Sequence, residues 1–224
     1  MKAYKFWFCT GSQDLYGDEC LRNVAEHSKI IVAHLGAGGS LSAVKDGKCI
    51  NTSMGFTPLA GIMMGTRSGD IDPSIIPFVM EKEGKNAAEV ISDLNKKSGF
   101  LGISQLSSDS RDIENGIAEG NEKCKLAQDK FVRTVVDYIA RYYVLLGGCD
   151  VLCFTAGIGE NSKGVRAQIV EKLACLGFKL DAQANDVRGE FRKISAEDSS
   201  SLIYIIPTDE ELMIARDTLN LINR

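Results

Sequence analysis

Residues 51–73, NTSMGFTPLAGIMMGTRSGDIDP, follow shortly after a glycine-rich loop at residues 34–40, HLGAGGS. Gly36, Gly38 and Gly39 permit positive φ, so successive backbone N–H groups can face one concavity and bind an anion. The loop lies between two strand-like runs, which excludes a P-loop and a dinucleotide fingerprint because both need a helix next. Taken alone, a glycine-rich hairpin is more often a tight turn than an anion site. The motifs around the loop therefore decide between an anion-binding loop and a simple tight turn.

Arg67 lies between two glycines in MGTRSGD, residues 64–70. A guanidinium suits a carboxylate or a phosphate because its planar fork gives two parallel hydrogen bonds. The alternative for this arginine is a surface salt bridge with Asp70 or Asp72.

Arg111 lies in a second polar turn, SSDSRD, at residues 107–112. It offers a second cation for a bound anion. The alternative is local: Asp109 or Ser108 is the N-cap of the helix that follows.

The stretch FTAGIGENS, residues 154–162, reads as a buried strand that ends in a glycine turn and opens a helix. Free N–H groups and the positive end of that helix would then face a ligand. Gly157 and Gly159 would let a flat base or a ribose approach the backbone closely. This motif is the clearest ligand-binding element in the chain.

Near the C-terminus, PTDEE at residues 207–211 contains a predicted capping box, Thr208 with Glu211. The box gives Asp209 and Glu211 structural roles and leaves Glu210 as a candidate magnesium ligand. The alternative for Glu210 is a solvated acid in the first turn of a helix.

Runs of apolar residues separated by glycine turns predict a β-meander at residues 30–33, 41–44 and 49–52, with a tight turn at Asp46-Gly47. Further along the chain, capping and spacing predict a mixture of helices and strands. They are a helix from Asn86 through Leu94 with a capping box to Glu89, a long amphipathic helix at 122–146 stopped by Gly147-Gly148, a strand at 151–154, a helix at about 162–173, a strand at 202–206 and a closing helix at 209–221.

The composition of the 224 residues is that of an ordinary globular protein, with a formal net charge of −4. No basic block suggests nucleic acid, and the apolar runs are too short to span a bilayer. The N-terminus lacks the basic region and long apolar stretch of a signal peptide. Seven cysteines with no CxxC pair indicate a reduced, cytoplasmic protein without a structural zinc site.

The five motifs, in this order over roughly residues 30–220, resemble the C-terminal, nucleotide-binding half of acetate kinase, and the resemblance covers about residues 29–224. It implies an α/β, ribonuclease H-like domain of the actin, hexokinase and Hsp70 superfamily, with a mixed sheet and flanking helices. It also implies conversion of ATP and acetate to ADP and acetyl phosphate, with Mg²⁺ and in a homodimer. Propionate or butyrate is the alternative acyl substrate.

The resemblance also implies roles for residues at matching positions. His34 and Arg67 are the candidate catalytic residues: His34 would contact the transferring phosphates, and Arg67 the acyl carboxylate and phosphoryl group. Glu210 would support magnesium. The candidate nucleotide-binding residues are Gly36, Gly38, Asp109, Ser110, Arg111, Gly157, Ile158 and Asn161. Ala37 departs from the family, which commonly has asparagine there, so a polar contact to phosphate or substrate would be lost.

Residues 1–29 instead resemble the N-terminus of L-arabinose isomerase, with Asp14 where that family usually has histidine. A single βα unit needs neighbouring strands, so this piece is predicted to be a segment and residues 30–224 the domain. The catalytic aspartate, transfer histidine and substrate arginine that precede the glycine loop in acetate kinases have no match here.

Three hypotheses follow from this organisation. The first is an acetate kinase lobe that binds ATP weakly and turns over little or not at all. The second is a non-catalytic nucleotide-binding or dimerisation fragment, produced by gene fusion or truncation, that pairs through the helix at 122–146. The third, a sugar isomerase remnant, predicts a divalent metal site, but only His27 and His34 are present and no ligand cluster accompanies them.

Overall fold

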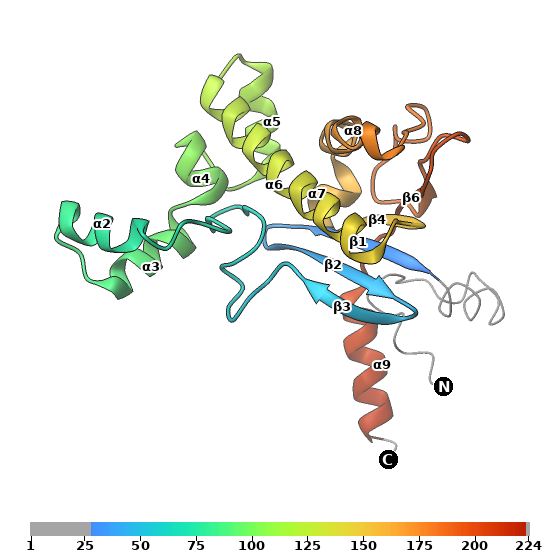
Figure 1. Ribbon diagram of the computed structural model, residues 1–224, viewed down its shortest axis with the longest axis horizontal. Helices are drawn as coiled ribbons and strands as arrows, with labels where there is room; N and C mark the ends of the chain where they lie inside the picture. The colour runs from blue at the N-terminus through green and yellow to red at the C-terminus, as the bar shows by residue number, and fades with distance from the viewer. Residues whose placement is uncertain (1–27, 223–224) are drawn as a thin grey trace.

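The computed structural model describes residues 28–222, except for the side chains of Glu210 and Met213. Its centre is a six-stranded mixed sheet of order β3-β2-β1-β4-β6-β5 (Figure 1). β1, β4 and β6 are parallel neighbours, and β2, β3 and β5 run antiparallel to the strands beside them. The strands are β1 (Lys29–Leu35), β2 (Gly39–Lys45), β3 (Lys48–Thr52), β4 (Val151–Thr155), β5 (Arg192–Lys193) and β6 (Leu202–Ile205). Apart from Ser28 and Lys29, the predicted isomerase-like segment lies outside the described residues.

The predicted β-meander is confirmed as β1, β2 and β3. Asp46 and Gly47 connect β2 to β3 with φ of 49° and 70°, and positive φ at both central residues is what a type I′ hairpin requires. β1 is apolar nearly throughout because it is central and covered on both faces.

Helix α6 (Glu122–Leu146) packs along one face of the sheet, together with the short α7 (Ala156–Asn161) and α8 (Lys163–Lys172) (Figure 1). Its apolar stripe, which includes Phe131, Val135 and Ile139, is buried in the main core. The helix ends at Gly147, whose φ of 68° allows the left-handed C-cap, as predicted. Its outer face carries ion pairs such as Arg133–Asp137. The apolar face of this amphipathic helix thus packs against the core of its own domain.

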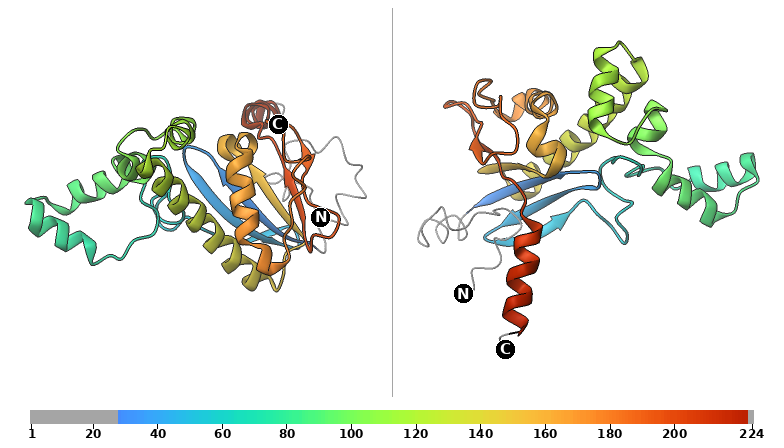
Figure 2. Two further views of the ribbon diagram at one scale, coloured as in Figure 1. Left: turned by 90° about the horizontal axis from the view of Figure 1, so that it is seen from above. Right: turned by 180° about the vertical axis from the view of Figure 1, so that it is seen from behind.

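A helical arm extends from the edge of the sheet between β3 and α6 (Figure 2). It consists of α2 (Ile75–Glu83), α3 (Ala87–Lys96), α4 (Gly99–Ser104) and α5 (Ser110–Ala118). The predicted capping box of α3 is present: the Glu89 N–H donates to Asn86 Oδ1 at 3.0 Å, and the Asn86 N–H donates to Glu89 Oε2 at 2.7 Å. α4 and α5 contact α6, which anchors the arm beside the sheet.

The final helix, α9 (Glu210–Ile222), projects from the opposite side of the sheet from α6 and α8 (Figures 1 and 2). The predicted capping box at its start is wrong. Asp209 is the cap, because its Oδ1 accepts from the Leu212 N–H at 3.0 Å. The hydroxyl of Thr208 instead donates to Glu160 Oε1 at 3.1 Å, a contact from 48 residues away.

The remaining connections are short, and they include the 3-10 helix η3 (Ala174–Leu176) after α8. A second, smaller apolar cluster covers the face of the sheet away from α6, around Val32, Cys153 and Ile206. Within residues 28–222, no helix is long and apolar enough to cross a membrane.

Candidate functional site

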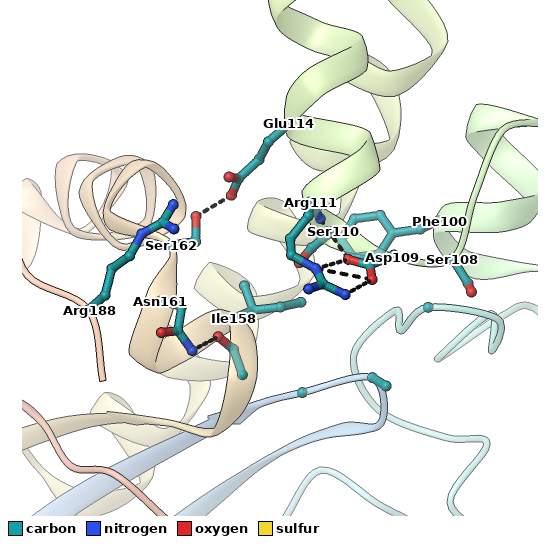
Figure 3. Close-up of a pocket in the computed structure, with 14 residues that line it drawn as sticks. Phe100, Ser108, Asp109, Ser110, Arg111, Glu114, Ile158, Asn161, Ser162 and Arg188 are labelled. Carbon is teal, nitrogen blue, oxygen red and sulfur yellow. Dashed lines mark hydrogen bonds and ion pairs between the residues drawn. The ribbon is translucent and has the colours of Figure 1, made fainter. Parts of the chain in front are cut away.

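A cavity of about 580 Å³ opens between the β1–β2 hairpin loop, the N-terminal end of α5 and the turn from β4 into α7 (Figure 3). These elements come from three distant parts of the sequence. The sheet places the hairpin loop beside the β4–α7 turn because β1 pairs with β4, and α5 reaches the same place because it packs against α6. The predicted nucleotide-binding residues that line the cavity are Gly36, Asp109, Ser110, Arg111, Gly157, Ile158 and Asn161. Gly38 is the one residue of that set that does not.

The loop around Arg67 is held against the hairpin loop by backbone hydrogen bonds. The Gly65 N–H donates to the Ala37 carbonyl oxygen at 3.2 Å. On the other side, the N–H groups of Ser98 and Phe100 donate to the carbonyl oxygens of Thr66 and Met64 at 2.9 and 3.0 Å. The loop is therefore fixed by main-chain contacts that do not depend on its own side chains.

The guanidinium of Arg67 lies beside the hairpin loop, because a Cβ added at Gly38 would be 3.3 Å from its Nη1. The predicted alternative, a salt bridge to Asp70 or Asp72, is wrong: Arg67 makes no ion pair with either. Asp70 instead accepts hydrogen bonds from Tyr138 Oη at 2.5 Å and from the Gly61 N–H at 2.8 Å. The geometry leaves the half-buried cation next to the glycine loop.

His34 is the last but one residue of β1, in register with Ser40 on β2 and Thr155 on β4. Its Nε2 would be 3.9 Å from a Cβ added at Gly36. Thus His34 and Arg67, the two predicted catalytic residues, both lie against the glycine loop, although neither lines the cavity itself.

Asp109 is the N-cap of α5, as the local alternative predicted: its Oδ1 accepts from the Arg111 N–H at 2.9 Å. Its carboxylate also forms a two-pronged ion pair with the Arg111 guanidinium, at 3.0 Å from Nε and 2.5 Å from Nη2. These side-chain hydrogen bonds, followed by the backbone bond from Arg111, lower the pKa of Asp109 to about 2. Asp109 can be a helix cap and a binding residue at once, because Asp109 and Arg111 both line the cavity.

Replacing Asp109 by alanine is expected to lower the free energy of unfolding by about 1 kcal/mol near neutral pH, because α5 loses its N-cap. The pKa of Asp109 in the folded chain lies below the ordinary 3.8, so its contribution is fully present above that value and is lost as the pH falls toward 2. In urea unfolding curves, the difference between wild type and Asp109→Ala should narrow between about pH 4 and about pH 2. A difference that stays constant over that range would contradict the cap as an ionised group.

The turn after β4 differs from its prediction in one respect. The predicted free N–H groups at the start of the helix include that of Ala156, but this group donates to Glu160 Oε1 at 2.8 Å. Ala156 adopts a left-handed φ of 63°, which is costly for a residue with a Cβ. Gly157 stays open: a Cβ added there meets no atom within 4 Å. The turn therefore presents a bare glycine backbone to the cavity.

The cavity also contains residues that the sequence did not single out, among them Phe100, Glu114 and Arg188. Glu114 lies one helical turn beyond Ser110 on α5. Helical spacing from the predicted turn at residues 107–112 could therefore have placed it on the same face as Ser110. Phe100 and Arg188 stand in no motif, and only the tertiary structure brings them to the site. The hydroxyl of Ser162 donates to Glu114 Oε1 across the cavity (Figure 3).

The described residues do not form a metal site of their own. No three acidic, histidine or cysteine side chains gather into a possible metal-binding group within this part of the chain. Glu210 is the first residue of α9, and its side chain lies outside the described atoms. Magnesium binding at Glu210 therefore stays a prediction.

The sheet order, the glycine hairpin between its first two strands and the cavity at the ends of β1 and β4 define a ribonuclease H-like domain of the actin and hexokinase type. The chain belongs to the acetokinase family, whose model matches residues 12–216.

Among curated relatives, the acetate kinase of Aster yellows witches'-broom phytoplasma is 55% identical over 196 residues, which is 88% of this chain and 48% of the relative. The acetate kinase of Phocaeicola vulgatus is 54% identical over 196 residues, which is 88% of this chain and 49% of the relative. The chain thus spans about half the length of the curated relatives that it matches.

Solved structures agree with this assignment. Porphyromonas gingivalis acetate kinase superposes with a TM-score of 0.84 at 43% identity, over 88% of this chain and 50% of that structure. Entamoeba histolytica acetate kinase gives a TM-score of 0.84 at 36% identity, over 96% of this chain and 55% of that structure. A propionate kinase from Francisella tularensis gives a TM-score of 0.80 at 40% identity, over 95% of this chain and 57% of that structure. The ribonuclease H-like fold expected from the resemblance is confirmed.

Proposed function

We propose that this chain is the nucleotide-binding lobe of an acetate kinase-type phosphotransferase, acting on ATP and acetate to give ADP and acetyl phosphate. The observation that carries the proposal is the 580 Å³ cavity, lined by residues from four of the five motifs: the glycine hairpin, the Arg67 loop through Gly65, the Asp109–Arg111 turn and the β4–α7 turn. Its volume lies in the range of small-ligand pockets, about 300–1,000 Å³. The adenosine would lie between Ile158 and the start of α5, with the phosphates at the hairpin loop.

The position of His34 and Arg67 beside the same loop supports the phosphoryl-transfer part of the proposal. In that reaction an acetate oxygen forms a bond to the γ-phosphorus while the bond from this phosphorus to ADP breaks. Catalysis of such transfers consists mostly of positioning and charge neutralisation. A guanidinium next to the glycine loop can supply one of these charges.

Because the matched relatives are about twice as long, we propose that this chain by itself binds nucleotide but turns over little. Isothermal titration calorimetry with the purified chain should give a dissociation constant for ADP below about 1 mM. A hydroxamate assay for acetyl phosphate should stay near background. Absence of ADP binding would overturn the proposal, and robust acetyl phosphate formation would overturn its low-turnover part.

Replacing Gly157 by valine is expected to block the nucleotide without damaging the fold. A Cβ at this position meets no protein atom within 4 Å, so any clash comes from the ligand. An overlap worth about 1–3 kcal/mol corresponds to roughly tenfold to hundredfold weaker ADP binding. Gly164→Val is the matched control, since Gly164 is equally open but lies outside the cavity. Equal ADP affinity in both variants would contradict the placement of the nucleotide at Gly157.

Three finer assignments belong to the same proposal. Acetate is favoured over propionate by the curated relatives, although a propionate kinase is also a structural neighbour. A reduced, cytoplasmic setting is supported by the thiols of Cys49, Cys124, Cys149 and Cys175, which are not in disulfides. A homodimer and magnesium bound at Glu210 rest on the family resemblance.

A further inference from the structure

Glu114 places a half-buried carboxylate in the wall of the cavity. Within the described part of the chain it forms no ion pair, and its hydrogen bond comes from the Ser162 hydroxyl to Oε1. Buried polar groups are normally satisfied, and an ionised carboxylate can accept about four hydrogen bonds. The second oxygen of Glu114 is therefore available to a donor on a bound ligand.

Ser162 holds this carboxylate in place. Its Oγ accepts from the Val165 N–H at 3.2 Å as the N-cap of α8, so the hydroxyl is fixed by the helix and its hydrogen is directed to Glu114. The pair thus joins α5 to the α7–α8 junction across the cavity. A carboxylate fixed in this way is preorganised to recognise one donor position.

The pair lies at the end of the cavity away from the hairpin loop. In Figure 3 the β1–β2 hairpin crosses the lower part of the view, whereas Glu114 and Ser162 lie in the upper part. Along the elements the order is the same: Glu114 is one turn beyond Ser110 on α5, and Ser162 follows α7 directly. A nucleotide with its phosphates at the hairpin loop would extend its base toward this pair.

We propose that Glu114 reads the base of the nucleotide by accepting a hydrogen bond from the exocyclic amino group of adenine. The inference rests on the proposed function and names the group that selects the base. An ionised carboxylate is an acceptor only, so it favours an amino group at this position. Hypoxanthine, which has a carbonyl oxygen in place of that amino group, would bring two acceptors together and lose the bond.

The test is calorimetric binding of ADP, inosine diphosphate and 2′-deoxy-ADP to three forms of the full chain: wild type, Glu114→Gln and Glu119→Gln. Wild type should prefer ADP over inosine diphosphate by about tenfold, the value of one hydrogen bond to a charged group. Glutamine can donate as well as accept, so Glu114→Gln should reduce the preference to about threefold or less. Glu119, exposed at the end of the same helix and outside the cavity, is the matched control and should keep the wild-type ratio.

The outcomes separate the inference from the proposed function. An unchanged ratio of ADP to inosine diphosphate in Glu114→Gln overturns the inference but leaves nucleotide binding standing. A change confined to the ratio of ADP to 2′-deoxy-ADP also overturns it, because Glu114 would then contact the ribose. No binding of any of the three nucleotides to wild type overturns both. Thermal unfolding of each variant shows that a changed ratio does not come from a damaged fold.

Discussion

Replacing Gly99 by alanine is expected to destabilise the chain by about 3–5 kcal/mol or to prevent folding, one of the larger effects that a single methyl group can have. Gly99 has a φ of 63°, and a Cβ built there would lie 2.0 Å from the Met64 carbonyl oxygen. That oxygen cannot retreat freely, because it accepts the Phe100 N–H at 3.0 Å. The same Cβ would lie 2.9 Å from the Arg67 carbonyl oxygen, so the strain falls on the loop that presents the catalytic candidate.

The control for this prediction is Gly84→Ala. Gly84 caps α2 with a φ of 65°, and a Cβ added there meets no atom within 4 Å. It therefore measures the cost of a left-handed backbone alone, about 1–2 kcal/mol. Urea unfolding of both variants checks the difference between them. If Gly99→Ala loses no more stability than Gly84→Ala, the close approach of α4 to the Arg67 loop is not a constraint on the fold.

Local signals predicted most elements because their causes are local. Asn86 and Glu89 cap α3 through atoms three residues apart, and Asp46-Gly47 turns the hairpin by its own backbone preferences. The start of α9 shows where such reasoning fails. Thr208 and Asp209 are both good capping residues. Glu160, in the helical turn that follows β4, accepts from the Thr208 hydroxyl and so leaves Asp209 as the cap.

The site was predictable to the extent that its residues stand in glycine or capping motifs. The hairpin loop, the Asp109–Arg111 turn and Gly157 could be found in the sequence, and the sheet together with the packing of α5 on α6 brings them to one cavity. Arg188 and the contact between Glu114 and Ser162 could not. Arg188 lies in an irregular loop before β5, and the contact depends on α5 lying opposite the α7–α8 junction. The alternative of a salt bridge from Arg67 to Asp70 or Asp72 rested on proximity in sequence, and Asp70 accepts from Tyr138 on α6 instead.

Arg166 gives no sign in the sequence that it is unusual, and its replacement is expected to have the second large effect. It lies on α8 and is fully buried, with a relative exposure of 0%. Its guanidinium donates five hydrogen bonds at 2.7–3.0 Å to four carbonyl oxygens and one side-chain amide. The acceptors are Gly159 O, Glu160 O, Asn185 O, Val187 O and Asn185 Oδ1. The arginine thus binds the end of the α7 turn to the loop that carries Arg188.

Arg166→Ala is expected to lose about 3–5 kcal/mol, because it leaves these buried acceptors without donors and opens a cavity. Arg166→Met fills much of the volume but supplies no donor, so it should lose nearly as much; a large recovery with methionine would mean that packing, not hydrogen bonding, holds the turn. Arg133→Ala is the control, because Arg133 is exposed in a pair with Asp137 that should contribute at most about 1 kcal/mol.

The pH dependence of the stability lost in Arg166→Met tests whether the charged guanidinium is the group that holds this turn. Burial lowers the pKa of Arg166 from 12.5 to about 10, so the guanidinium is charged throughout the neutral range. Because the pKa of the folded chain is the lower one, the cost of burying the charge is constant below about 10 and is relieved only above it. The stability difference between wild type and Arg166→Met should therefore stay level from about pH 6 to about pH 9. A difference that changes steeply within that range would mean that the guanidinium is not the group that holds Gly159 and Glu160, and that the open turn at Gly157 has another support.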